Sequence, residues 1–281
     1  MNSFNRERNV NKNFKNIFKF ILLTVIGLAL ILPFVYNYIC KNRVYDDIEQ
    51  KITKEVLQAN VHIVRCTTSE GITNYSTGFG GGVFQKEDNK FYVLTAYHVV
   101  ESIDNSVLRV IRYEDLSYTE LNKQSSEHIS LEGYYLQLPM ATIEYYNKSY
   151  DLAILSFYTD ENVGTLKIAE EPSQYNDRII SISQPANERD TIITYGRVTS
   201  KEPKTVTFED GSKTDYIIRH SAYGAAGSSG SIVLNENLKI AGINIGGGRD
   251  RFENFRYSYA MPSEQIKSFL KEWGKYVQTK F

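Results

Sequence analysis

TAYHVV at positions 95–100, SYDLAIL at 149–155 and GAAGSSGSIV at 224–233 are the stretches that decide how this chain folds and what chemistry it carries. They supply a histidine, an aspartate and a serine, in that order. A serine hydroxyl is a weak nucleophile at neutral pH. It becomes reactive when an imidazole takes its proton and a carboxylate orients the imidazole. The three stretches together predict an activated-serine hydrolase.

The histidine of the first stretch is His98, and its local sequence suits a catalytic base. GGVFQKEDNKFYVLTAYHVV at 81–100 predicts a hairpin whose second strand ends at His98, so that the sheet holds the ring while it faces a cleft. For a lone histidine a structural or surface role is the stronger alternative. The two partner stretches favour the catalytic interpretation, and His62, His128 and His220 lack a comparable setting.

The aspartate of the second stretch, Asp151, stands directly before the apolar segment LAILSFY. A carboxylate at the edge of a core is costly to bury unless a donor reaches it. A ring N–H of His98 is the natural donor, and this bond would fix the tautomer that leaves the other ring nitrogen free to accept a proton. An exposed turn aspartate is the alternative.

The third stretch is a loop of small residues that leads directly into the apolar segment SIVL. Glycines allow backbone N–H groups to converge, so we expect the N–H groups of Gly227 and Ser229 to form an oxyanion hole. Three hydroxyls are candidates for the nucleophile, those of Ser228, Ser229 and Ser231, and the spacing favours Ser229. A flexible linker is the alternative, which the apolar continuation disfavours.

Composition excludes several other classes of protein. The chain has 281 residues, 42% of them hydrophobic and 23% charged, with a formal net charge of -1, so no basic field indicates a nucleic-acid partner. We expect Cys40 and Cys66 to be free thiols, because disulfide frameworks need more cysteines. The sequence contains no H-E-x-x-H motif and no Cys/His cluster of ligand spacing, and we expect no metal and no cofactor.

The beginning of the chain differs from the rest. Residues 1–19 form a basic leader, and 20–39 (FILLTVIGLALILPFVYNYI) carry no charge, which predicts a single transmembrane helix. Because the basic residues precede the span, we expect a cytoplasmic N-terminus and an extracytoplasmic globular part, at the cell surface or in the periplasm. A cleaved signal peptide is the alternative. Residues 40–58 predict a short juxtamembrane helix or stalk.

From residue 59 onward the chain predicts short strands separated by turns, with almost no interior helix, which indicates an all-β fold. Residues 102–138 include a long polar stretch that we interpret as a surface insertion between two strands. Residues 263–277 predict a C-terminal helix, because Ile266, Phe269 and Trp273 fall on one stripe. The expected strands are VHIVRCTT, GGVF, FYVLTAYHVV, VLRVIRY, MATIEYY, DLAILSFY, RIISISQ, TIITYGRVTS, KTVTFE, DYIIRHSA, SIVLN and KIAGINIGG.

The three stretches together resemble the chymotrypsin-like (trypsin-fold) serine peptidases, most closely the bacterial HtrA-type and glutamyl-endopeptidase-like branches. TAYHVV is similar to that family's TA-x-H-V, DLAIL to its D-L-A-[IVL]-L and GSSGS to its G-x-S-G-[GS]. The resemblance implies a peptidase domain over 59–281 made of two six-stranded antiparallel β-barrels, at about 59–160 and 175–262. It places the histidine and the aspartate on the first barrel and the nucleophile on the second.

The resemblance also identifies candidates for the substrate pocket. Tyr223 stands six residues before the nucleophile, where trypsin-like enzymes carry an acidic residue, and Asn244 stands where glutamyl endopeptidases carry a histidine. AGINIGG, which includes Gly246, resembles the strand that lines the substrate cleft. We therefore expect a neutral residue before the scissile bond. Ser228 replaces the aspartate that pairs with a new N-terminus in trypsin-like zymogens, so we expect no activation by that ion pair.

These observations predict a membrane-anchored serine endopeptidase that acts on peptide or protein substrates. Two alternatives remain, a protease fold that binds peptides without cleaving them and a serine hydrolase that acts on esters. The first would lack a member of the triad, and none of the three residues is missing. A Ser–Lys peptidase would need a lysine near the nucleophile, and the GSSGS segment has none beside it in the sequence.

Overall fold

The computed structural model describes residues 45–101, 106–184, 191–207, 211 and 213–280. The chain divides into two units, Met1–Lys51 and Ile52–Phe281. In the first unit the described part holds one short helix, α2 (Asp46–Glu49). The leader and the transmembrane span expected at 20–39 lie outside the described residues. Within the described ranges no helix is both long enough and apolar enough to cross a membrane.

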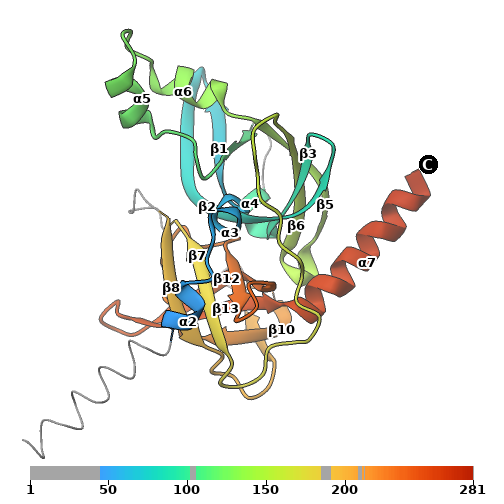
Figure 1. Cartoon of the computed structure of the whole chain (residues 1–281). Helices are drawn as coiled ribbons and strands as arrows, with labels where there is room; N and C mark the ends of the chain where they lie inside the picture. Colours follow the sequence, from blue (N-terminus) through green and yellow to red (C-terminus); the bar gives the residue numbers. More distant parts are fainter. Residues whose placement is uncertain (1–44, 102–105, 185–190, 208–210, 212, 281) are drawn as a thin grey trace, which may run out of the picture. The chain divides into compact units, whose positions relative to one another are not determined.

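The second unit begins with helix α3 (Lys54–Gln58) and continues into a closed six-stranded barrel, in the order β1-β2-β3-β6-β5-β4 (Figure 1). The closure confirms the expected first barrel. The sequences of the strands explain the fold, because β3 and β6 are each seven mostly apolar residues, of which six are buried. The six strands are β1 (Asn60–Ser69), β2 (Ile72–Glu87), β3 (Lys90–Ala96), β4 (Ser106–Ile111), β5 (Met140–Asn147) and β6 (Leu152–Tyr158).

The insertion between β4 and β5 folds into two short helices, α5 (Tyr118–Gln124) and α6 (Leu131–Gln137). The location agrees with the expected surface insertion, and the two short helices within it were not predicted from the sequence. Serine caps explain the helices: the Ser117 side chain accepts from the N–H of Glu120, and the Ser130 side chain accepts from the N–H of Gly133. Such caps involve only a few neighbouring residues, so hydrophobic periodicity does not predict the helices that they begin.

The second half of the unit is a seven-stranded sheet in the order β8-β7-β11-β12-β13-β10-β9. The prediction of a second closed six-stranded barrel is corrected here, because the sheet is open and forms a half-barrel. One isolated bridge, Val198↔His220, joins the end of β8 to β10, and β9 adds to the edge as a hairpin with β10. The strands are β7 (Arg178–Ser183), β8 (Ile192–Arg197), β9 (Lys204–Thr207), β10 (Lys213–His220), β11 (Ile232–Asn235), β12 (Ile240–Arg249) and β13 (Phe255–Pro262).

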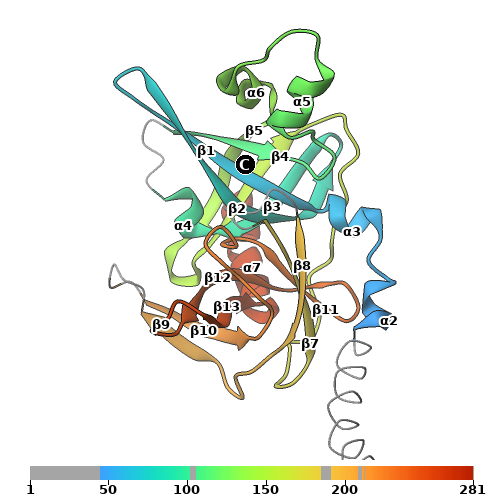
Figure 2. The ribbon, with the colours of Figure 1, turned by 90° about the vertical axis from the view of Figure 1, so that its left-hand side faces the viewer.

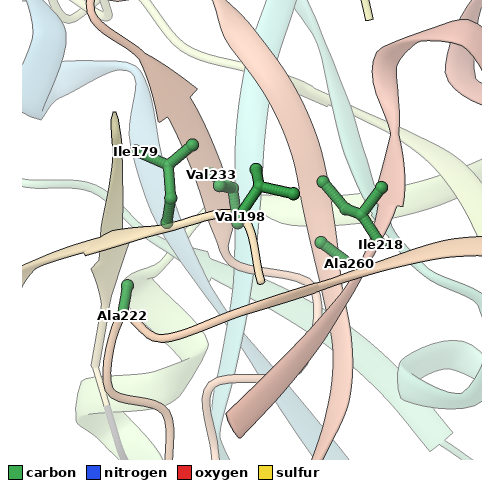
Figure 3. Packing of buried hydrophobic residues seen from close by; sticks show 6 residues of the cluster. All are labelled: Ile179, Val198, Ile218, Ala222, Val233 and Ala260. Atoms are coloured by element: carbon green, nitrogen blue, oxygen red, sulfur yellow. The ribbon is translucent and has the colours of Figure 1, made fainter. Parts of the chain in front are cut away.

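A small cluster of buried aliphatic side chains from four of these strands and their flanks forms part of the core of the half-barrel. Figure 3 shows how these side chains lie. Their burial fixes which face of the sheet is internal. The cluster comprises Ile179, Val198, Ile218, Ala222, Val233 and Ala260.

Strand β13 is absent from the strands expected from sequence. Its sequence FRYSYAMP alternates aromatic residues at 255, 257 and 259 with the buried Ser258 and Ala260. This period of two is the signal that could have identified it.

The C-terminal helix α7 (Ser263–Lys280) is confirmed and runs three residues beyond the expected end. Ile266 and Phe269 of the expected stripe are fully buried. The helix follows β13 of the half-barrel and contacts the first barrel: the Phe269 ring lies 5.4 Å from that of Tyr145, and the Trp273 ring 5.3 Å from that of Tyr92. Helix α7 therefore links the two sheets of this unit.

Two fully buried histidines predict that this protein loses stability in weak acid. Burial lowers the pKa of His62 and of His220 from 6.5 to about 4. Between these values the unfolded chain binds more protons than the folded chain, so stability is intact above pH 6.5 and falls as the pH drops toward 4. Each histidine should cost about 2 kcal/mol between roughly pH 7.5 and pH 5.

Urea unfolding at these two pH values measures the effect. His220→Gln should remove about half of the pH-dependent loss, whereas the exposed His128→Gln should leave it unchanged. Equal pH dependence in the two variants would contradict the assignment.

Candidate active site

Strand pairing brings His98 and Asp151 together although they are far apart in the sequence. β3 and β6 are antiparallel neighbours, with Ala96 paired to Leu152. His98 follows the end of β3 and Asp151 precedes the start of β6, so both stand at the same end of the barrel. His98 lies in the short helix α4 (Tyr97–Val100) rather than at the end of the strand, which corrects the sequence prediction.

The Asp151 carboxylate holds His98 through two hydrogen bonds. Oδ2 lies 2.8 Å from the ring Nδ1, and Oδ1 accepts from the backbone N–H of His98 at 2.9 Å. The carboxylate side chain is 7% exposed and the imidazole 36%. When Nδ1 carries the proton, Nε2 holds the lone pair that can accept another. This is the geometry of an oriented general base.

The backbone around Asp151 is itself fixed. Asp151 follows the 3₁₀ turn η1 (Lys148–Tyr150) and adopts a left-handed conformation with φ 49°, which aspartate tolerates better than most residues. Helix α7 supports this segment through Glu272, which accepts from the Tyr150 hydroxyl at 2.9 Å and from the Asn147 amide at 3.0 Å.

The loop that carries Ser229 contains a tight turn. The N–H of Ser228 donates to the carbonyl of Ala225 at 2.9 Å, and Gly227 at the third position has φ 95°. A positive φ at the third position without one at Ala226 is typical of a type II turn and favours glycine at position 227. The Ser228 hydroxyl closes the turn again, because it accepts from the N–H of Ala225 at 3.1 Å and lies 3.4 Å from the Ser183 hydroxyl.

The two N–H groups expected to form an oxyanion hole are those of Gly227 and Ser229. Neither donates to a backbone carbonyl within the described part of the chain. Ser229 is half-buried, whereas Ser228 and Ser231 are buried. Of the three candidate nucleophiles, Ser229 is therefore the most accessible.

A close approach of two backbones joins this loop to the first barrel. The N–H of Gly80 on β2 donates to the carbonyl of Ser229 at 2.8 Å, and the Thr95 hydroxyl on β3 donates to the carbonyl of Gly80 at 2.7 Å. A Cβ at position 80 would lie 2.7 Å from the Cα of Ser231, so only glycine permits the contact. The Ser229 loop is thus held against the strand that leads to His98.

Two adjoining cavities flank these residues. The first has a volume of about 210 Å³ and is lined by Ser229 and Asn244 among others. The second, of about 760 Å³, is lined by His98 and Asp151 on one side and by Val206, Thr207 and Thr214 on the other. Figure 2 shows α4 on the side of the first barrel where β9 and β10 lie. Both cavities share three lining residues, Gly246, Gly247 and Tyr257.

The pocket candidates differ in where the structure places them. Asn244 and Gly246 line the first cavity. Tyr223 lines neither cavity: its side chain is 42% exposed and its ring packs 5.2 Å from that of Phe255. Both ends of the Asn244 side-chain amide already contact buried residues. Its Oδ1 lies 2.9 Å from Nε2 of His220, and its Nδ2 donates to the Ser181 hydroxyl at 2.8 Å.

Sequence reasoning missed the side chains that β13 and the end of β12 contribute to the first cavity. Phe255, Tyr257 and Ser258 come from β13, whose alternation of aromatic residues was the available signal. Arg249 ends β12, and no motif distinguishes it in the sequence. No group of three His, Cys, Asp or Glu side chains suited to a metal occurs among the residues described.

Comparisons with known proteins identify the family to which the chain belongs. A family model described as "Trypsin-like peptidase domain" matches residues 80–243, a span that contains His98, Asp151 and Ser229. The chain is also similar to the serine protease Do-like HtrA of Bacillus subtilis (strain 168), at 26% identity over 227 residues. That alignment covers 79% of this chain and 45% of the relative, so the chain spans less than half of the relative's length.

The backbone contact at Gly80 can be tested by substitution. Gly80→Ala should lower the free energy of unfolding by about 3 kcal/mol, because the added methyl group would overlap Ser231. Gly274→Ala on α7 is the matched control: nothing lies within 4 Å of the added Cβ, and alanine favours a helix by about 1 kcal/mol. Chemical denaturation of both variants measures the difference, and equal stability would contradict the assigned contact.

Proposed function

Because this chain belongs to the trypsin-like peptidase family, we propose that it is a serine endopeptidase with Ser229, His98 and Asp151 as its catalytic triad. The observation that supports this most directly is the pair of hydrogen bonds that the Asp151 carboxylate accepts from His98, at 2.8 and 2.9 Å. Burying a carboxylate at the end of a barrel costs free energy, and hydrogen bonds to an imidazole that it orients offset this cost.

In the proposed mechanism, the Ser229 hydroxyl attacks the carbonyl carbon of a peptide bond while Nε2 of His98 takes its proton. The imidazolium that forms is stabilised by the Asp151 carboxylate at Nδ1. It then protonates the leaving amine, and the C–N bond breaks to give an acyl-enzyme. Water, deprotonated by the same imidazole, hydrolyses the ester and restores Ser229.

The charge that develops on the carbonyl oxygen requires donors that are already in place. We assign this role to the N–H groups of Gly227 and Ser229, which have no backbone acceptor in the described part of the chain. The Ser228 hydroxyl accepts a hydrogen bond from the N–H of Ala225, and this bond stabilises the turn that carries the two N–H groups. This bond forms within the loop, which supports the expectation that no N-terminal ion pair is needed for activity.

Substitution of the triad tests the function. A fluorophosphonate probe should label the wild type, and Ser229→Ala should lose labelling and lower kcat/KM for peptides by roughly 10⁴-fold or more, because no nucleophile remains. Asp151→Asn should lower kcat by about 10⁴-fold through loss of the imidazole's orientation. Ser231→Ala is the control and should retain labelling, since the Ser231 hydroxyl is fully buried.

Labelling that survives Ser229→Ala would move the nucleophile elsewhere. An unlabelled wild type that still binds peptides would favour a non-catalytic binding module, and hydrolysis confined to esters would favour an esterase.

We also propose that residues 20–39 anchor the peptidase in a membrane, with the N-terminus in the cytoplasm. The uncharged run of 20 residues after a basic leader supports this proposal. The full chain should sediment with membranes and resist extraction by carbonate, and a protease added outside intact cells should remove the catalytic domain. Release of the chain by carbonate, or its recovery without the first 39 residues, would contradict an uncleaved anchor.

A further inference from the structure

The first cavity is placed to receive one side chain of a substrate. The substrate carbonyl must reach the Ser229 hydroxyl with its oxygen toward the N–H groups of Gly227 and Ser229. The side chain on the acyl side of the scissile bond then enters the cavity bounded by 224–226 on one wall and 246–248 on the other. These walls consist of glycine and alanine, so they present no charge and little bulk.

Arg249 is the one residue with a formal charge at neutral pH among the described residues that line this cavity. It ends β12, where the register with β13 shifts between Gly248 and Arg249. Such a bulge interrupts the alternation of side chains and redirects the residue that follows it. At Gly248 the Tyr257 ring packs directly against the backbone of this wall. A Cβ on residue 248 would lie 2.4 Å from a ring atom of Tyr257.

No carboxylate neutralises this guanidinium among the described residues. Its Nη1 donates to the backbone carbonyl of Glu253 at 2.8 Å, which leaves further N–H donors available. The adjacent Asp250 is engaged elsewhere, since it accepts from the N–H of Phe252 at 2.8 Å and pairs with Arg256 at 3.0 Å. These interactions hold the pKa of Asp250 below its usual value, and the hydrogen bond from the N–H of Phe252 contributes most.

The turn that follows β12 fixes the carbonyl that holds Arg249. The N–H of Asp250 donates to the carbonyl of Asn254 at 2.9 Å, and the N–H of Glu253 donates back to the carbonyl of Asp250 at 3.0 Å. The guanidinium is therefore anchored before a substrate arrives.

The buried floor of the cavity adds no competing charge. Asn244 is bonded to Ser181 and contacts His220, and burial keeps His220 neutral at pH 7 by lowering its pKa to about 4. The expectation of a neutral cleavage site considered Tyr223 and Asn244 alone and did not include Arg249.

We propose that Arg249 makes this enzyme cleave after acidic residues, by binding the carboxylate of a glutamate or aspartate side chain in the cavity beside Ser229. This inference rests on the proposed peptidase function. A guanidinium binds a carboxylate through charge-assisted hydrogen bonds, which are stronger than those to a neutral amide. Because the guanidinium is exposed, added salt should weaken the preference.

Peptides that differ only in glutamate or glutamine before the scissile bond measure the preference. For the wild type, kcat/KM should be at least about tenfold higher for glutamate, and the ratio should decrease as sodium chloride is raised. Arg249→Gln should bring the ratio near one by lowering kcat/KM for the glutamate peptide more than for the glutamine peptide. Arg249→Glu should instead favour lysine at this position.

Arg251→Gln is the matched control, because Arg251 belongs to the same turn, lies over the Phe252 ring at 4.6 Å and lines neither cavity. It should keep the wild-type ratio. A wild type that cleaves both peptides equally, or a preference that persists in Arg249→Gln, would overturn this inference and leave the peptidase function standing. Absence of both cleavage and fluorophosphonate labelling would overturn the two together.

Discussion

The hydrogen bond from the N–H of Gly80 to the carbonyl of Ser229, at 2.8 Å, is the contact on which this site depends. His98 follows a strand of the first barrel and Ser229 precedes a strand of the second sheet, so no local chain geometry sets the distance between them. The Gly80 carbonyl also accepts from Thr95 on β3, the strand that leads to His98. Gly80 therefore positions the loop of Ser229 relative to β3, the strand that leads to His98. A Cβ at position 80 would lie 2.7 Å from the Cα of Ser231, so a side chain there would force these two backbones apart.

A second connection reaches the carboxylate from the opposite direction. Helix α7 begins where the half-barrel ends, yet its Glu272 binds Tyr150 and Asn147, which flank the turn before Asp151. The loop of the serine rests on the first barrel, and the loop of the aspartate is held by a helix that continues from the second sheet. Relative movement of the two sheets would strain both attachments, which favours a single arrangement of the three residues.

The parts of the fold that could be predicted from the sequence are those set by local pattern. The apolar runs LAILSFY and FYVLTA indicate buried strands wherever they occur, and the stripe containing Ile266 and Phe269 predicts α7 by itself. Closure of the second sheet is different, because it depends on how far β8 and β10 stay in register, and they share a single bridge. The helices α5 and α6 depend on serine caps of a few residues and escaped detection for that reason.

The candidate site divides in the same way. The candidate triad residues, His98, Asp151 and Ser229, could be identified from short stretches, because each stretch carries its residue in a characteristic local sequence. The lining of the pocket does not, because it depends on pairing between β12 and β13. Counting six residues back from Ser229 reaches Tyr223, which does not line the cavity and packs against Phe255. The register shift after Gly248 instead brings Arg249 to the cavity, at a position that no motif marks. The charge that lines the cavity therefore depends on strand register, whereas the three candidate residues of the triad are marked by local sequence.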